Sequence, residues 1–138
     1  MNDRAFLDTN LLIYLYSDSE PQKRTAAYQA LNAHDCMTSM QALNEASNIW
    51  FKKCGWNGQK IKEHIDNIEL VCQEILTVQK NTIVKALEIK DRYGYSYYDC
   101  LMLSSALEGQ CSVIFTEDMK DGQVIDDNLT IVNPLAHG

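Results

Sequence analysis

The stretch AFLDTN, residues 5–10, is a short apolar run that ends abruptly in a carboxylate and two small polar residues. Residues 4–7 show no apolar-polar alternation, which is typical of a strand covered on both faces in a parallel sheet wound with helices. Open sheets of this kind bind ligands at the carboxyl ends of their strands, and Asp8 stands at that edge. The alternative is that one of the three polar residues only caps the helix predicted over residues 11–16.

The length of 138 residues is enough for one compact core, and no Pro-rich, Ser-rich or repetitive tract divides the chain. We therefore expect a single domain over residues 1–138. The longest early apolar run, residues 11–16, is far too short for a membrane span, and no secretory core precedes it. These features predict a cytoplasmic protein with no membrane partner.

The five cysteines are odd in number and contain no Cys-x-x-Cys pair. This pattern argues against a disulfide framework and against a zinc site, so we expect reduced cysteines in the core. The net charge of −7 is unusual for a protein that binds nucleic acid. Divalent cations on clustered carboxylates would offset part of it. A rim of lysines could contact phosphate or simply form a solvated face; these are Lys52, Lys53, Lys60 and Lys62.

Helical and strand patterns alternate along most of the chain, which predicts right-handed connections and a mostly parallel sheet. The expected strands are residues 4–7, 36–38, 74–78, 111–115 and 129–132. The last of these is expected at an edge because Pro134 follows it. The expected helix caps are Asp18 or Ser19, Ser39, Thr82 and Ser96. The fold class is therefore α/β with a five-stranded sheet.

Three further acidic residues are expected at the same sheet edge as Asp8. Asp118 follows an apolar run that ends at Phe115, which repeats the pattern of the first strand. Glu45 lies early in the helix that begins at Met40, and Asp99 lies at the start of another helix. The alternative for Asp99 is that its carboxylate closes a capping box with Ser96.

Four carboxylates within a few ångströms repel one another unless cations offset their charge. The three histidines are scattered and no cysteine joins the acids, so the oxygen ligands favour Mg²⁺ or Mn²⁺. Two such cations about 4 Å apart would activate a water and stabilise the leaving oxygen of a phosphodiester. We expect Asp8 and Asp99 to be the principal metal ligands. Supporting roles fall to Thr9, Asn10, Thr116 and Glu117.

Four segments, in their order along the chain, resemble the motifs of the PIN-domain nucleases: FLDTN at 6–10, QALNE at 41–45, SYYD at 96–99 and TEDM at 116–119. With DGQ at 121–123 and VNP at 132–134, the chain is most similar to the VapC toxins of type II toxin–antitoxin pairs. The resemblance implies a three-layer α/β/α sandwich, a magnesium-dependent endoribonuclease, a homodimer and a cognate antitoxin. It carries the catalytic acid roles onto Asp8, Glu45, Asp99 and Asp118.

The fourth acid could be either of two neighbours, Glu117 or Asp118. We favour Asp118 because the Thr-x-Asp spacing lets the Thr116 hydroxyl and the Asp118 carboxylate converge across a tight turn. Glu117 is then expected to point away. The alternative is that Asp118 only closes the turn.

Two other functions fit parts of the pattern. A haloacid-dehalogenase-like phosphatase also uses a strand-end aspartate, but it needs a second aspartate where this chain has Asn10. A non-catalytic PIN-fold protein could use the acidic cleft only to hold a partner. An inhibitory partner would be expected to insert an Arg or Lys among the acids and to cover apolar side chains. Candidate side chains are those of Trp50, Phe51 and Trp56, or of Tyr97 and Tyr98. The alternative for the tryptophans is burial in the core or in a homodimer contact.

Overall fold

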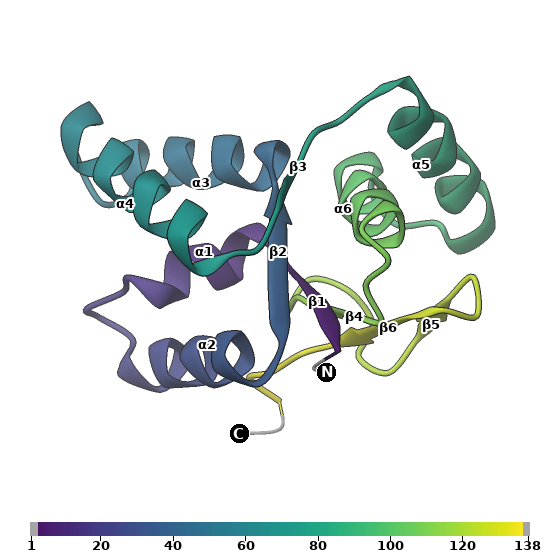
Figure 1. Cartoon of the computed structure of the whole chain (residues 1–138), viewed down its shortest axis with the longest axis horizontal. Helices are drawn as coiled ribbons and strands as arrows, with labels where there is room; N and C mark the ends of the chain where they lie inside the picture. The colour runs from purple at the N-terminus through teal and green to yellow at the C-terminus, as the bar shows by residue number, and fades with distance from the viewer. Residues whose placement is uncertain (1–2, 137–138) are drawn as a thin grey trace.

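The computed structural model describes residues 3–136, which form a central sheet with helices on both sides (Figure 1). Helices α1 to α4 lie on one side of the sheet, and α5 and α6 lie on the other. The elements are β1 Arg4–Leu7, α1 Thr9–Leu15, α2 Pro21–Ala33, β2 Asp35–Ser39, α3 Met40–Lys52, α4 Gly58–Val71, β3 Ile75–Leu76, α5 Lys80–Tyr93, α6 Tyr97–Glu108, β4 Val113–Phe115, β5 Val124–Ile125 and β6 Leu129–Val132.

The sheet has the order β3-β2-β1-β4-β6-β5, with β1 near its centre. Strand β1 pairs in parallel with β2 on one side and with β4 on the other, and β4 pairs in parallel with β6. Among the strands of residues 3–136, only β5 runs antiparallel to its neighbour. The mostly parallel α/β fold is therefore confirmed. Because β1 and β4 pair in parallel, their carboxyl ends lie side by side, with Leu7 opposite Phe115.

The predicted count of five strands is wrong, because the sheet has six. The missed strand, β5, has only two residues, too few to show a strand pattern in the sequence. It pairs with β6 across a turn in which Asp126 and Asp127 take positive φ, a conformation that aspartate tolerates. Because β5 takes the edge, β6 is an internal strand, contrary to the prediction.

The helix ends agree in part with the predicted caps. Ser39 and Ser96 accept hydrogen bonds from backbone N–H groups in the first turns of α3 and α6. Helix α2 instead has Glu20 at its N-cap with no side-chain bond, so the predicted cap at residue 18 or 19 is wrong. Thr82 lies inside α5, where its hydroxyl accepts from the N–H of Gln79, the N-cap residue.

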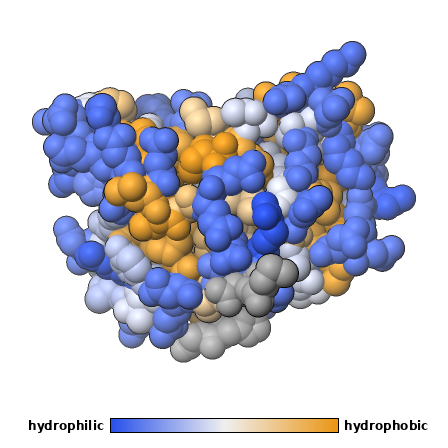
Figure 2. Space-filling view, in the orientation of Figure 1, coloured by the Kyte–Doolittle hydropathy of each residue, from blue (hydrophilic) through white to orange (hydrophobic). Residues whose placement is uncertain are grey.

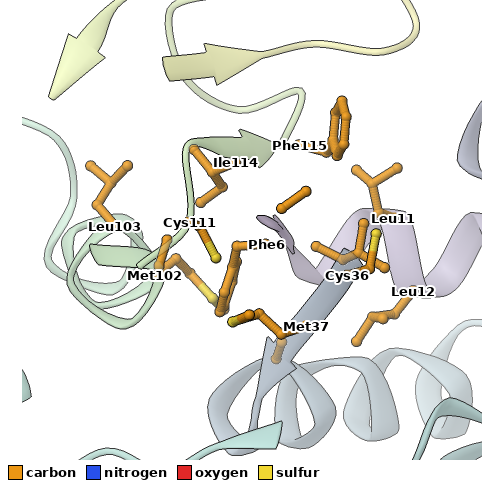
Figure 3. Packing of buried hydrophobic residues seen from close by; sticks show 14 of the residues in the cluster. Phe6, Leu11, Leu12, Cys36, Met37, Met102, Leu103, Cys111, Ile114 and Phe115 are labelled. Carbon is orange, nitrogen blue, oxygen red and sulfur yellow. The ribbon is translucent and has the colours of Figure 1, made fainter. Parts of the chain in front are cut away.

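The core lies between the sheet and both helix layers (Figure 3). Phe6, Met37 and Ile114 come from three adjacent strands and are fully buried. Met102 from α6 meets them on one side. Four of the cysteines are buried and free as expected, whereas Cys54 is exposed.

The aromatic side chains proposed for partner binding do not form one exposed surface. Trp50 is 1% exposed and stacks on Trp56, with ring centroids 5.2 Å apart. Phe51, the next residue of α3, points to solvent instead. The prediction that Trp50 contacts a partner is therefore wrong, because its ring belongs to the core.

The face drawn in Figure 2 has hydrophilic residues over the outer ends of the two helix groups and a mixture of hydrophobic and hydrophilic residues toward its middle. Between residues 3 and 136, no helix is both long enough and apolar enough to cross a membrane.

Candidate active site

Three carboxylates from separate parts of the chain meet at the carboxyl edge of the sheet. Asp8 follows β1, Asp99 lies in the first turn of α6, and Asp118 lies in the loop after β4. One oxygen of each lies within 4.8 Å of an oxygen of the other two. The parallel pairing of β1 with β4 brings Asp8 and Asp118 together, and α6 delivers Asp99 from the other face.

Asp8 is the most enclosed of the three, at 4% exposed. Its Oδ1 accepts from the Thr9 N–H at 2.7 Å, and its Oδ2 accepts from the Thr116 hydroxyl at 2.7 Å. Asp8 is thus the N-cap of α1 and a member of the cluster at once, so the two alternatives for this residue coexist. Burial raises its pKa to about 6, although the bonds from Thr116 and Thr9 oppose the rise.

Asp99 is held by its backbone as well as by its place in the helix. Its N–H donates to the Ser96 hydroxyl at 3.2 Å, which is the capping bond of α6. The carboxylate is half-buried and faces the cluster. Burial raises the pKa of Asp99, and the Ser96 hydroxyl partly counters this. A carboxylate at a helix N-terminus is also stabilised by the helix dipole.

The loop after β4 separates the roles of Glu117 and Asp118. Asp118 accepts from Asn10 Nδ2 at 3.2 Å, and its N–H donates to the Thr116 hydroxyl at 3.2 Å. Burial raises the pKa of Asp118, and the negative charges of Asp99 and Glu117 raise it further. The Thr116 hydroxyl therefore accepts from the Asp118 backbone and donates to the Asp8 carboxylate, which links the turn to the cluster.

Glu117 is bonded elsewhere, because its carboxylate accepts from the hydroxyl of Tyr14 on α1. That hydroxyl in turn accepts from Lys23 Nζ at 3.2 Å. Burial raises the pKa of Tyr14 to about 12, so the hydroxyl remains protonated and able to donate. Glu117 therefore points toward α1 and α2, away from the three carboxylates. The role of Tyr14 could not be predicted from the sequence, because its partner lies 103 residues along the chain.

Glu45 lies beside the three-carboxylate cluster and is not one of its members. Its carboxylate accepts from Gln41 Nε2 at 2.8 Å and from the Thr9 hydroxyl at 3.5 Å. Gln41 precedes it by one turn of α3, the spacing that places both on one helix face. Burial raises the pKa of Glu45, and the charges of Asp99 and Asp118 raise it further.

The four carboxylates have only neutral hydrogen-bond partners, and no ion pair within residues 3–136 includes any of them. Buried negative charge without a protein counter-ion is unfavourable. Asp8, Asp99 and Asp118 offer converging carboxylate oxygens, which are the ligands that hard divalent cations take. The residues present therefore fit Mg²⁺ or Mn²⁺.

We predict that the metal-free protein loses stability as the pH rises from about 4 to above 6. The folded state raises the pKa of Asp8 from 3.8 to about 6, so it retains a proton that the unfolded chain has already released. The free energy of unfolding therefore falls through this window, by about 2–3 kcal/mol if Asp8 acts alone. Thermal melts in EDTA between pH 4 and 8 measure the effect.

Added Mg²⁺ should raise the melting midpoint at pH 7.5 more than at pH 4.5, because protonated carboxylic acids bind cations poorly. Equal midpoints in EDTA across this range, with no response to Mg²⁺ or Mn²⁺, would contradict the cation site.

Comparison with known proteins gives one sequence match and several structural ones. The sequence model of the PIN domain matches residues 5–120. No curated protein matches the sequence. A toxin–antitoxin complex from Klebsiella pneumoniae contains a chain with a TM-score of 0.71 and 22% identity, over 94% of this chain and 97% of that chain.

Two further solved structures have the same architecture. VapC20 of Mycobacterium tuberculosis, described as a sarcin–ricin loop cleaving toxin, has a TM-score of 0.66 and 20% identity over 83% of this chain and 91% of its own. VapBC2 from Rickettsia felis, solved bound to a promoter DNA fragment, has a TM-score of 0.63 and 14% identity over 94% and 99%. At these identities the likeness shows the shared fold.

Proposed function

Because the chain belongs to the PIN domain family, we propose that it is a metal-dependent endoribonuclease and the toxin of a toxin–antitoxin pair. The observation that carries the proposal is the meeting of Asp8, Asp99 and Asp118 within 4.8 Å, where no ion pair among residues 3–136 supplies a counter-charge. The match to the PIN domain family argues against the alternative of a haloacid-dehalogenase-like phosphatase. A PIN-fold protein that binds without catalysis is the remaining alternative.

Asp8, Asp99 and Asp118 would hold Mg²⁺ or Mn²⁺. The bound cation supplies a more acidic water and positive charge beside the phosphate. Asp8 is fixed in place by two short hydrogen bonds, so its carboxylate keeps its orientation when the site is empty. The side-chain amide of Asn10 likewise holds the carboxylate of Asp118, which is more exposed, through a hydrogen bond.

Glu45 is assigned the proton-handling role. It lies outside the three-carboxylate cluster, and its two hydrogen bonds hold it at the edge of the site. Burial raises its pKa toward the range in which a carboxylate accepts a proton effectively. We assign to its carboxylate the acceptance of a proton from the attacking water. Thr9, which bonds both Asp8 and Glu45, sets the position of one relative to the other.

The partners proposed are an RNA substrate, an antitoxin protein and a second copy of this chain, all in the cytoplasm. Support comes from the similar structures, one of which is a toxin–antitoxin complex and another a sarcin–ricin loop cleaving toxin. An antitoxin is also consistent with the chemistry, because an Arg or Lys side chain would supply the counter-charge that the four carboxylates lack.

The test is cleavage of a single-stranded RNA by the purified protein with Mg²⁺ or Mn²⁺. We expect cleavage that EDTA abolishes and that excess metal restores, and little cleavage of a DNA strand of the same sequence. Metal binding shown by calorimetry, without any RNA cleavage at high enzyme concentration, would favour the non-catalytic alternative.

A further inference from the structure

Tyr98 places an exposed aromatic ring one residue before a member of the carboxylate cluster. The residue is 65% exposed, whereas its neighbour Tyr97 is half-buried and packs against the core. The next residue, Asp99, contributes a carboxylate to the cluster. An aromatic ring left in solvent at this position has no structural role in the core.

Two contacts position Tyr98, one through its backbone carbonyl and one through its ring. The Tyr98 carbonyl accepts from Gln41 Nε2 at 3.2 Å, and the same amide group donates to Glu45. The ring of Tyr98 meets that of Tyr97 edge-on, with centroids 5.7 Å apart and planes at 63°. Met40, the first residue of α3, precedes Gln41 and is 52% exposed. A ring ordered before binding loses little entropy when a ligand packs on it.

The charge of the site limits how a nucleic acid strand can be held. The chain carries a net charge of −7, and the hydrogen-bond partners that residues 3–136 offer to its four site carboxylates are all neutral. A phosphate backbone meets repulsion at these carboxylates except at the bound cations, so an uncharged contact beside the cluster would add affinity without this repulsion. Stacking of a base on an aromatic ring is such a contact, and it changes affinity by about tenfold or more per base.

We propose that the Tyr98 ring stacks on an unpaired base of the RNA strand whose phosphodiester lies at the carboxylate cluster. The inference rests on the proposed function and narrows its substrate to RNA with an unpaired nucleotide at that position. A base inside a duplex already stacks on its neighbours and does not present a free face.

The experiment measures binding of a fluorescent single-stranded RNA by anisotropy, with Ca²⁺ in place of Mg²⁺ to slow cleavage. We expect Tyr98→Ala to bind about tenfold more weakly, and Tyr98→Phe and Tyr98→Trp to bind like wild type. Because stacking involves no counterion release, the loss should be the same at about 50 and about 200 mM salt. Leu70→Ala is the control, since it removes an exposed apolar side chain from α4.

Strands with one abasic nucleotide, moved along the sequence, identify the stacked base. One abasic position should weaken binding to wild type by the same factor as Tyr98→Ala, and should have no effect on that variant. If the abasic nucleotide and Tyr98→Ala weaken binding independently and additively, the stacking is overturned. Unchanged RNA binding by Tyr98→Ala overturns it as well, even if the variant binds the antitoxin more weakly. If the wild-type protein neither binds nor cleaves RNA, both the stacking and the proposed function are wrong. If the wild-type protein cleaves RNA and Tyr98→Ala binds RNA equally well, only the stacking is wrong.

Discussion

Asp8→Asn should abolish metal-dependent RNA cleavage, by at least about 10³-fold, and leave the protein folded. Asp8 is the most buried carboxylate of the cluster, and both of its oxygens are fixed by hydrogen bonds. Asparagine keeps the size and one carbonyl oxygen but removes the negative charge that would hold the cation. Cleavage of a labelled RNA at saturating Mg²⁺ measures the effect, and titration of Mn²⁺ by calorimetry measures the lost metal affinity.

The same substitution should raise the thermal midpoint of the metal-free protein near pH 7.5. Burial raises the pKa of Asp8 to about 6, so at this pH the wild type holds a charge that is disfavoured in the fold. The difference should shrink below about pH 5, where Asp8 is protonated in the folded wild type. Full activity in Asp8→Asn, or a large drop in its midpoint, would contradict this account.

The matched control is Asp91→Asn, which removes the charge of an exposed aspartate on α5. It should leave cleavage, metal affinity and the melting midpoint near wild-type values, because surface substitutions of this kind change stability by only about 0.5 kcal/mol. A loss of activity in the control would assign the effect of Asp8→Asn to net charge instead of to the site.

The sequence was sufficient to place the ends of the central strands. An apolar run that stops at a carboxylate is a local signal, and parallel pairing then brings the stops together at one edge. Asp8 and Asp118 could be assigned to that edge in this way, and their oxygens do converge. Asp99 required a further step, because Ser96 and Asp99 also fit a capping box. In the structure the Ser96 hydroxyl accepts from the Asp99 N–H, and the Asp99 carboxylate lies in the cluster.

The features that could not be predicted from the sequence depend on contacts between distant segments of the chain. The Tyr14–Glu117 bond joins α1 to the loop after β4, and neither residue carries a local pattern that indicates the other. Trp50 and Phe51 are adjacent and both apolar, yet only Trp50 is buried, because it stacks on Trp56 from the segment that leads into α4. A two-residue strand such as β5 exists only because β6 is available for pairing.

The second large effect separates two neighbouring acids. Asp118→Asn should reduce cleavage by about 10²-fold, whereas Glu117→Gln should reduce it by only about two- to fivefold. The Asp118 carboxylate lies with those of Asp8 and Asp99, while the Glu117 carboxylate accepts from Tyr14. Glutamine retains a carbonyl oxygen for that bond, so the loop that carries Asp118 should keep its position.

The two variants control for each other, because each is isosteric and each removes one negative charge from the same loop. Any effect of charge on RNA association is therefore shared, and the ratio of their activities reports which side chain acts on the reacting phosphate. Cleavage rates and Mn²⁺ affinities are measured for both, and metal affinity should fall for Asp118→Asn alone. A greater loss of activity and of Mn²⁺ affinity in Glu117→Gln would reverse the assignment, since it would mean that Glu117 leaves Tyr14 when the cation binds.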